Sequence, residues 1–470
     1  MQSHYQLNAM YYTRLIDAYL VEWAQRDTHK PLLLRGARQV GKSTAVRHLG
    51  EQFEQFVEIN FEKQPFFKQL FQGHLDVQKI VPQMSAMVGQ PIMPGKTLLF
   101  LDEVQACPEA IMSLRFFKED LPELHVIAAG SLLEFALQEL PTLGVGRIHS
   151  MFMYPMTFDE FLMANGEYLL MEARNQANVA NPLPEPLYQK LVSLFRTFIL
   201  VGGLPEVVSR WVQKHDYLSC QEVQDDIVLT YEDDFSKYKK KVDSALLRLT
   251  MRSAALQTGR KFVCSQVGNY QTKEVKRALE LLTLAGILTP AKHSSANGLP
   301  LGVEANTSYQ KMLLLDSGLM LRLLNLSIGD ITDLTTQILT GNVVDLVNKG
   351  PMAELIAGLE QIRYQSPNLR HELFFWIRQA RNSQAEVDYV TNYKSHVLPI
   401  EVKSGTQGGM KSLWLFMREK KLNNAIRCSL ENFSTFNFID KEDDGAVRHV
   451  QVCPIFAISQ MGRLLEEFEW

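Results

Sequence analysis

A glycine-rich segment with a lysine and a serine follows the first strongly apolar run of the chain. The run PLLLRG leads into Gly36-Ala37-Arg38-Gln39-Val40-Gly41-Lys42-Ser43, which fits the pattern GxxxxGK[ST] between a strand and a helix. Glycine lets the backbone N–H groups of such a loop wrap around phosphates, and the N-terminus of the following helix adds a favourable dipole. Lys42 is expected at the β- and γ-phosphates, Ser43 as a Mg²⁺ ligand and Thr44 as an assisting residue in the first helical turn. The pattern predicts a site for ATP and Mg²⁺, with a chance glycine turn as the alternative.

Two adjacent carboxylates end a second apolar run, LLFLDE. Asp102 and Glu103 would then stand at the C-terminal end of a parallel strand, where open α/β sheets bind ligands. Asp102 is expected to orient the metal and its water, and Glu103 to polarise the water that attacks the γ-phosphate. A strand ending in Asp-Glu often only begins a solvated loop, but its place after a phosphate loop indicates a Walker B motif.

Two further side chains are candidates for a place near the γ-phosphate. Ser131 ends the run LHVIAAGS, so it is either a sensor residue at the same sheet edge or the N-cap of the helix LLEFALQEL. Arg147, before the run IHSMFMY, is either an arginine finger for a neighbouring subunit or the partner of a local carboxylate. A finger accelerates hydrolysis by roughly 10³–10⁵-fold, and it would make a homo-oligomer the active form.

A cluster of acidic side chains and a lysine lies in the C-terminal third of the chain. Asp388 is in the run AEVDYV, whereas Glu401 and Lys403 are two residues apart in VLPIEVKS and point to the same face of a strand. Burying these charges is costly unless a metal or substrate compensates them. Asp388 and Glu401, with Glu354 from a preceding helix, can hold a hard cation such as Mg²⁺, and Lys403 can orient a hydrolytic water. This layout is that of a metal-dependent phosphodiesterase, with a purely structural salt-bridge cluster as the alternative.

The surrounding sequence supplies the elements that must hold these residues. From about residue 30 to 156, short apolar runs alternate with helix-length segments, which indicates a mainly parallel α/β sheet. After a helical stretch, two short helices, SQVGNY and KEVKRALELLTLAG, precede the strand-like runs ILTPAK and KMLLLD, an order typical of a winged helix. A small helical packing module, with Lys273, Lys276 and Arg277 on a solvated face, is the alternative. From about residue 349 a second α/β unit follows without a phosphate loop.

Composition narrows the classes of protein. The chain has 470 residues, enough for two to four domains, and its 48 basic and 52 acidic side chains give a net charge of −4. The net charge therefore does not indicate that the protein binds nucleic acid, and any contact with DNA would need a local basic patch. The five cysteines form no CxxC pair, which argues against a zinc site or a disulfide framework and fits a reducing cytoplasm. The first residues lack a signal-peptide core, and no apolar run approaches the ~18–20 residues that span a bilayer.

The order of several short motifs resembles a prokaryotic family of AAA+-like ATPases with a C-terminal domain of unknown function. The motifs are GARQVGKST, LLFLDEVQ, the GS of HVIAAGS, GR followed by YPMTFDEF, VGGLPE, LLLDSGL, EVDYV and IEVKSG. The resemblance implies an AAA+-type ATPase, a winged-helix-like middle and a PD-(D/E)xK restriction-endonuclease-like domain. Carried over by motif position, the ATPase residues would be Lys42, Ser43, Asp102 and Glu103, and the nuclease residues Glu354, Asp388, Glu401 and Lys403. The run AEVDYV also places Glu386 on the face of Asp388, so either carboxylate is a candidate metal ligand.

We therefore expect an α/β protein with four parts: an AAA+-type ATPase domain at 1–165, a helical lid or connector at 166–252, a winged-helix-like segment at 253–330 and a nuclease-like domain at 331–470. The expected function is that ATP binding and hydrolysis control a DNA-acting, metal-dependent nuclease domain. The alternative is a regulatory ATP switch whose C-terminal domain binds DNA or a protein without cutting. Expected ligands are ATP and Mg²⁺, with a second divalent metal in the C-terminal domain.

Overall fold

Five short apolar strands form the sheet of the N-terminal domain, as the sequence predicts. They lie in the order β2-β3-β4-β1-β5, and every neighbouring pair is parallel. Their bounds are β1 Leu32–Arg35, β2 Gln55–Asn60, β3 Thr97–Asp102, β4 His125–Ala129 and β5 His149–Phe152. Because all of them run the same way, their carboxyl ends share one edge of the sheet, and β4 separates β1 from β3 there.

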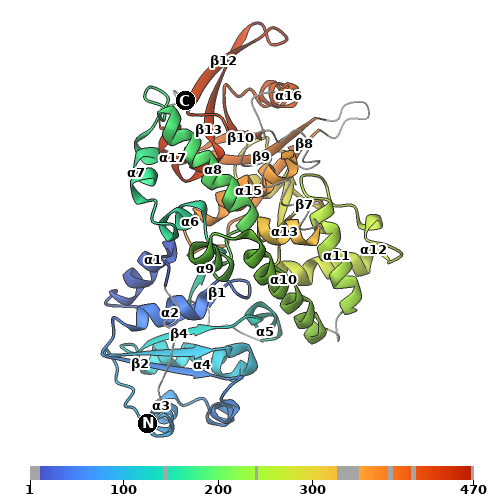
Figure 1. Cartoon of the computed structure of the whole chain (residues 1–470). Helices are drawn as coiled ribbons and strands as arrows, with labels where there is room; N and C mark the ends of the chain where they lie inside the picture. The colour runs from blue at the N-terminus through green and yellow to red at the C-terminus, as the bar shows by residue number, and fades with distance from the viewer. Residues whose placement is uncertain are drawn as a thin grey trace.

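Helices cover both faces of this sheet, which explains why its strands are continuous apolar runs. Leu32 and Leu34 of β1 belong to the core shared with α1 and α2, whereas Leu33 belongs to the core shared with α3 and α4. The helices of the domain are α1 Leu15–Ala24, α2 Lys42–Gly50, α3 Val77–Val88, α4 Pro108–Asp120, α5 Leu133–Glu139 and α6 Phe158–Ala164. Figure 1 shows the domain in blue and cyan at one end of the molecule.

A helical part follows the N-terminal domain. Its helices are α7 Tyr168–Gln176, α8 Glu185–Val201, α9 Pro205–Lys214, α10 Tyr217–Asp234, α11 Ser244–Leu256, α12 Thr272–Leu284 and α13 Ser317–Leu323. The prediction of a helix at SQVGNY is wrong, because the structure has only a short 3-10 turn there, Cys264–Gln266. Gly268 follows with a φ of 134°, which a right-handed helix does not accommodate.

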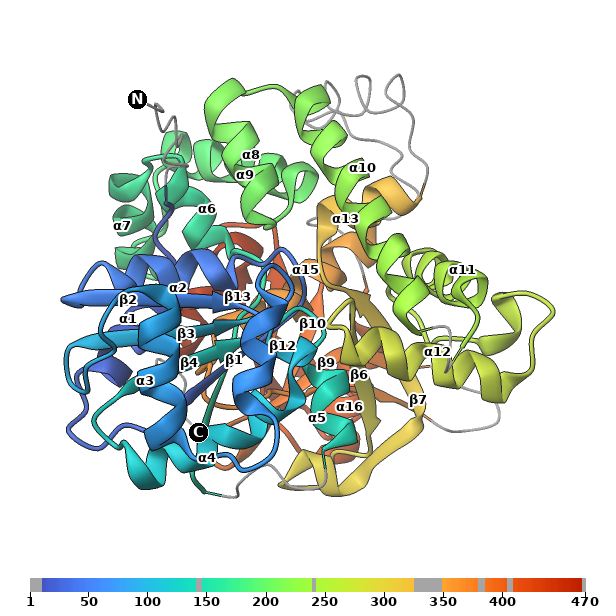
Figure 2. The ribbon, with the colours of Figure 1, turned by 90° about the horizontal axis from the view of Figure 1, so that it is seen from below.

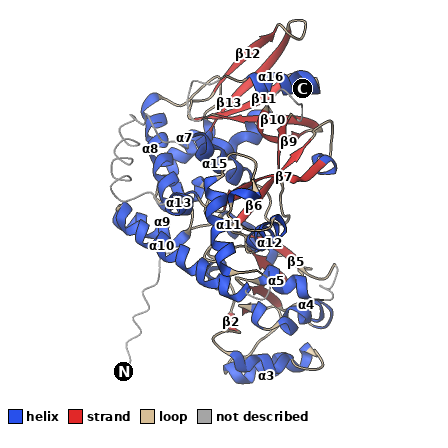
Figure 3. Cartoon of the chain, turned by 90° about the vertical axis from the view of Figure 1, so that its right-hand side faces the viewer, coloured by secondary structure: helices blue, strands red, loops and turns tan. Residues whose placement is uncertain are grey.

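An eight-stranded mixed sheet lies at the opposite end of the molecule, where Figure 3 shows its strands in red. The strand order is β12-β13-β11-β10-β9-β8-β6-β7. The strands are β6 Leu288–Ser294, β7 Ala305–Leu314, β8 Leu373–Ile377, β9 Glu386–Tyr393, β10 His396–Val402, β11 Asn424–Ser429, β12 Ser434–Asp440 and β13 Ala446–Pro454. The accompanying helices are α15 Lys349–Arg363, α16 Lys411–Lys420 and α17 Met461–Leu465.

The hairpin of β6 and β7, expected as a wing, is part of this sheet. β6 pairs antiparallel with β7 and parallel with β8, so that Lys292 lies opposite Phe374. Helices α11 and α12 pack beside the hairpin (Figure 2). The pairing with β8 occupies the outer edge of β6, so the two strands extend the C-terminal sheet and do not stand alone as a free wing.

The computed structural model describes residues 11–140, 146–238, 242–324, 349–378, 385–403 and 409–466. The predicted domain boundary between residues 330 and 331 lies outside these ranges. Among the helices described, none combines the length and the apolar composition needed to cross a membrane.

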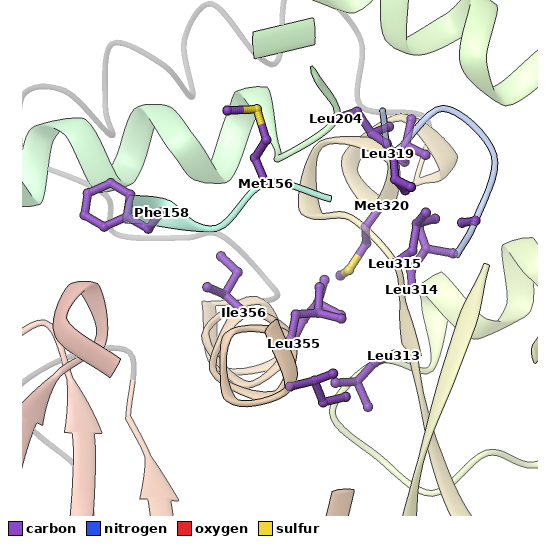
Figure 4. Packing of buried hydrophobic residues seen from close by; sticks show 14 of the residues in the cluster. Met156, Phe158, Leu204, Leu313, Leu314, Leu315, Leu319, Met320, Leu355 and Ile356 are labelled. Atoms are coloured by element: carbon purple, nitrogen blue, oxygen red, sulfur yellow. The ribbon is translucent and has the colours of Figure 1, made fainter. Parts of the chain in front are cut away.

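One buried apolar core runs through all three parts of the chain. Figure 4 shows a portion of it, in which side chains from the segment after β5 meet side chains of α13, α15 and β7. The labelled residues are Met156, Phe158, Leu204, Leu313, Leu314, Leu315, Leu319, Met320, Leu355 and Ile356. Because this apolar surface is removed from water only when the parts are together, its burial favours their association.

Candidate functional site

The loop between β1 and α2 requires glycine at two positions. Gly36 has a φ of 148° and Gly41 a φ of 97°, values that residues with a Cβ rarely adopt. A Cβ on Gly36 would lie 2.1 Å from the carbonyl oxygen of Met153. Gly41 is the N-cap of α2 and has no side chain that could cap it, so a bound anion can accept hydrogen bonds from the first N–H groups of the helix.

The lysine of the loop is buried and held by the loop itself. Lys42 Nζ donates to the carbonyl oxygens of Gly36 at 2.9 Å and Ala37 at 2.7 Å. Burial lowers the pKa of Lys42 to about 8, although the charges of Glu103 and Asp102 act in the opposite direction. The loop therefore positions a single ammonium group among its own backbone atoms, beside two carboxylates.

The predicted magnesium ligands lie together. Ser43 Oγ lies 3.2 Å from both carboxylate oxygens of Asp102, and these are the oxygen ligands that Mg²⁺ prefers. Asn60 Nδ2 donates to Asp102 Oδ2 at 3.1 Å from the neighbouring strand β2. Burial, followed by the charge of Glu103, raises the pKa of Asp102, a shift that a nearby cation would oppose. Sequence reasoning missed Asn60, although the run FVEIN ends in a polar residue at the same sheet edge.

Glu103 and Ser131 are also brought together. The backbone N–H and the hydroxyl of Ser131 donate to Glu103 Oε2 at 3.2 and 3.0 Å, and Gln105 Nε2 donates to the same oxygen at 2.6 Å. Burial acts to raise the pKa of Glu103, but these hydrogen bonds outweigh it and the pKa lies below its ordinary value. Leu132, and not Ser131, is the N-cap of α5. Gln105 was not foreseen from the sequence.

The remaining loop residues contact other parts of the chain. Arg38 forms an ion pair with Asp234 at the end of α10, and the hydroxyl of Tyr231 donates to the carbonyl oxygen of Arg38 at 2.7 Å. Arg14, before α1, donates to the carbonyl oxygen of Val40 at 2.8 Å. The loop is thus held by α10 on one side and by the start of the described chain on the other.

Arg147 lies away from these groups. It forms an ion pair with Glu119 of α4, which is the local partner that the second interpretation of this residue expects. Because Arg147 precedes β5, it lies at the amino edge of the sheet, opposite the phosphate loop. A γ-phosphate that Arg147 contacts would have to belong to a neighbouring subunit.

The predicted C-terminal residues come from α15, β9 and the end of β10. Lys403 Nζ lies 2.5 Å from Glu401 Oε1, and Asp388 Oδ2 accepts a 2.8 Å hydrogen bond from the backbone N–H of Val402. Burial and the charge of Asp388 raise the pKa of Glu401 to about 7, while Lys403 acts to lower it. Glu354 is buried on α15, and its pKa is likewise raised by burial.

A lysine that the sequence did not single out lies among these carboxylates. Lys311 of β7 is buried and forms ion pairs with Glu354, at 2.5 Å, and with Glu386. Burial acts to lower the pKa of Lys311, but the neighbouring carboxylates raise it well above its ordinary value. No local pattern marks Lys311, because β7 reaches the cluster only through its place in the eight-stranded sheet.

The cluster suits a hard divalent cation. Glu354, Glu386 and Asp388 each offer a carboxylate oxygen, and these oxygens lie within 4.8 Å of one another. Glu401 is 4% exposed, and its Oε2 has no hydrogen-bond partner among the residues the structure describes. An all-carboxylate set with a buried oxygen lacking a partner fits Mg²⁺ or Mn²⁺. Glu386 and Asp388, the two carboxylates that the sequence leaves as alternative metal ligands, both lie in the cluster.

Three regions of the chain match known protein families. Residues 28–162 match an AAA domain, residues 192–329 match a domain of unknown function (DUF8612), and residues 349–444 match another (DUF4143). No curated protein sequence matches the chain. The first region covers most of the N-terminal domain, the second runs from within α8 past the β6–β7 hairpin and α13, and the third holds α15, α16 and strands β8 to β12.

Several solved structures are similar to parts of this chain. The Walker-type ATPase PABY2304 of Pyrococcus abyssi has 14% identity and a TM-score of 0.44 over 67% of this chain and 96% of that one. PCH-2 of C. elegans has 17% identity and a TM-score of 0.21 over 37% and 50% of the two chains. The Hsp104–ADP complex of S. cerevisiae has 10% identity and a TM-score of 0.27 over 58% and 38%.

Proposed function

From the AAA-type P-loop domain that residues 28–162 form, we propose that the protein binds ATP with Mg²⁺ and hydrolyses it. The observation that carries the proposal is the meeting of Ser43, Asp102 and Glu103 beside the phosphate loop, with Lys42 held within it. These are the groups that phosphoryl transfer to water requires: a phosphate cradle, a metal position and a carboxylate near the attacking water.

The residues divide the work by their chemistry. The loop N–H groups and Lys42 would bind the phosphates, and Ser43 and Asp102 would hold the cation. Asn60 fixes the orientation of the Asp102 carboxylate by donating a hydrogen bond to it. When bound, Mg²⁺ neutralises charge on the β- and γ-phosphates. Glu103 orients the attacking water, and its ionised state is favoured by the hydrogen bonds from Gln105 and Ser131.

Two variants separate binding from turnover. Lys42→Ala should weaken the binding of labelled ATP and lower the hydrolysis rate by roughly 10²-fold or more, because a group that stabilises the phosphates is lost. Glu103→Gln should keep ATP binding and lose roughly 10²–10⁴-fold in turnover. Lys79→Ala, on the exposed face of α3, is the matched control and should behave like wild type. Folded wild-type protein without saturable ATP binding would refute the proposal.

We further propose that the C-terminal domain acts on DNA as a metal-dependent nuclease under the control of nucleotide state. The support is the group of three carboxylates, Glu354, Glu386 and Asp388, together with the buried Glu401 and its ion-pair partner Lys403 at the end of β10. Wild type, Asp388→Ala and Lys403→Ala should be incubated with DNA, ATP and Mg²⁺ or Mn²⁺, with Lys394→Ala in the exposed turn between β9 and β10 as the control. Cleavage by wild type and the control alone is expected.

The second candidate is an ATP switch whose C-terminal domain binds DNA or a protein partner and cuts nothing. The net negative charge of the chain favours this function over DNA cleavage. So does Lys311, whose ammonium group lies among the carboxylates where the metal ion of a nuclease would bind. Under this function Lys42→Ala abolishes partner binding or assembly, while Lys403→Ala leaves both intact. Equal DNA cleavage by wild type and Lys403→Ala would likewise argue against the nuclease.

We also propose that Arg147 completes the ATPase site of a neighbouring copy. Its place at the sheet edge opposite the phosphate loop supports action between subunits. Arg147→Ala and Glu103→Gln should each be inactive alone, yet a mixture should regain activity because some interfaces then combine an intact Arg147 with an intact Glu103. A mixture as inactive as its components would contradict action between subunits.

A further inference from the structure

The carboxylates of the cluster come from α15, β9 and β10, whereas Lys311, which pairs with two of them, comes from β7. It is 1% exposed, its Nζ lies 2.5 Å from Glu354 Oε1, and it also pairs with Glu386. The ammonium group lies 5.0 Å from the centre of the Phe375 ring, so an aromatic face closes another side of it. A buried lysine is tolerated here because two carboxylates compensate its charge.

The two lysines neutralise only part of the negative charge of the carboxylates in the cluster. Lys311 pairs with Glu354 and Glu386, and Lys403 with Glu401 Oε1, which leaves Glu401 Oε2 without a hydrogen-bond partner among the described residues. In the part of the chain that the structure describes, four carboxylates therefore stand against two ammonium groups, with Glu354 and Glu401 buried and Glu386 and Asp388 partly buried. Such a partly buried excess of carboxylates favours the binding of a further cation.

We propose that Lys311 is a tethered cation that competes with a divalent metal ion for Glu354 and Glu386. Lys311 Nζ donates to Glu354 Oε1, so it occupies one acceptor direction of that oxygen, and its positive charge repels a divalent ion there. Metal binding is therefore stronger when Lys311 Nζ moves away from the carboxylates. The inference rests on the metal site of the proposed nuclease function, but neither on DNA cleavage nor on ATP hydrolysis.

The backbone of Lys311 has little freedom to follow its side chain. It pairs with Ala291 of β6 and forms an isolated bridge to Lys261 on its other side. The side chain must therefore rotate out of the cluster, or the whole of β7 must shift. Since β7 leads directly to Asp316, whose carboxylate binds the turn before α9, a shift of β7 would connect metal affinity to the helical part.

The test is a titration of full-length, nucleotide-free protein with Mn²⁺ alone, followed by the electron paramagnetic resonance signal of free Mn²⁺. Lys311→Met keeps the length of the side chain and removes its charge. It should bind Mn²⁺ at least ten times more tightly than wild type, whereas Lys292→Met, whose lysine pairs with Glu372 outside the cluster, should match wild type. Adding Asp388→Asn to both the wild type and Lys311→Met should abolish the difference, which assigns it to this cluster and not to the phosphate loop.

Stability supplies a second readout. In EDTA, Lys311→Met and Lys311→Gln should melt at a lower temperature than wild type because the carboxylates lose their counter-charge, and added Mn²⁺ should raise the melting temperature more than in wild type. Equal Mn²⁺ affinity and equal Mn²⁺-dependent stabilisation of wild type and both variants would overturn the role of Lys311 while leaving the metal site standing. Absence of Mn²⁺ binding in every variant would overturn both.

Discussion

The backbone N–H of Gly203 donates a 2.6 Å hydrogen bond to Oδ2 of Asp316 and so fastens the turn VGGLPE to the chain just after β7. A Cβ on Gly203 would lie 2.2 Å from the carbonyl oxygen of Met156, whose N–H donates to Gly203 at 2.6 Å. Arg363 of α15 donates to the carbonyl oxygens of Met156 and Leu315. The segment after β5, the turn before α9 and the end of β7 thus meet at one junction next to the apolar cluster of Figure 4.

Asp316→Ala should destabilise the protein more than the loss of an ordinary helix cap. Asp316 is 1% exposed and accepts from Gly203 N–H and, as the N-cap of α13, from Leu319 N–H at 3.0 Å. Its removal leaves two buried donors unsatisfied, so we expect the free energy of unfolding to fall by about 2–4 kcal/mol, measured by urea denaturation. Asp216→Ala, which removes the exposed N-cap of α10, should lower the free energy of unfolding much less. If both variants lose the same free energy of unfolding, the hydrogen bond from Gly203 to Asp316 contributes nothing beyond the helix cap.

Asn60→Ala should raise the Mg²⁺ requirement of ATP hydrolysis. Asn60 Nδ2 holds Asp102 Oδ2 at 3.1 Å, and loss of a group that orients a metal ligand typically costs about 10–100-fold in metal affinity. We expect the Mg²⁺ concentration for half-maximal activity to rise within that range, measured by steady-state ATPase assays at saturating ATP. Asn165→Ala, at the end of α6, is a control of the same residue type and should leave the requirement unchanged. If Asn60→Ala needs the same Mg²⁺ concentration as wild type, Asn60 does not support metal binding by Asp102.

Ser131→Ala should slow turnover without weakening ATP binding. The Ser131 hydroxyl holds Glu103 Oε2 at 3.0 Å, while the backbone N–H of residue 131 and Gln105 keep their bonds to the same oxygen. Because part of the support remains, we expect a fall of roughly tenfold in the rate at saturating ATP and an unchanged dissociation constant for labelled ATP. Ser85→Ala on α3 serves as the control. Weaker ATP binding at an unchanged rate would instead assign Ser131 to substrate binding.

The sequence predicts which motif residues of the N-terminal domain lie together, because each motif is local. A glycine loop between strand and helix, and carboxylates at a strand end, are specified within a few residues, and parallel strands bring Ser43, Asp102 and Ser131 to one edge. Asn60 and Gln105 lack such a pattern, since their roles arise only from the neighbours that the sheet gives them. Lys311 is the clearest case. Its charge enters the cluster because β6 joins β8, a long-range pairing that period-two alternation within β7 cannot reveal.

Acidic pH should destabilise the N-terminal domain through a pair of stacked histidines. The rings of His29 and His125 lie 3.8 Å apart, and their Nε2 atoms contact the carbonyl oxygens of Leu124 and Ala24. Burial, followed by the nearby charge of His29, lowers the pKa of His125 to about 4, and burial also lowers the pKa of His29. The unfolded chain takes up protons at the ordinary histidine pKa of about 6.5, while the folded chain resists protonation, so stability is lost as the pH falls from about 6.5 towards 4.

Between pH 7 and pH 5, we expect the free energy of unfolding to fall by on the order of 1–2 kcal/mol from these histidines, after allowance for partial solvent screening. Urea denaturation at the two pH values measures the difference. His125→Gln keeps a polar side chain that does not titrate and should lose most of this pH dependence, whereas the exposed His74→Gln should retain it. If His125→Gln and His74→Gln show the same pH dependence as wild type, the buried stack is not its source.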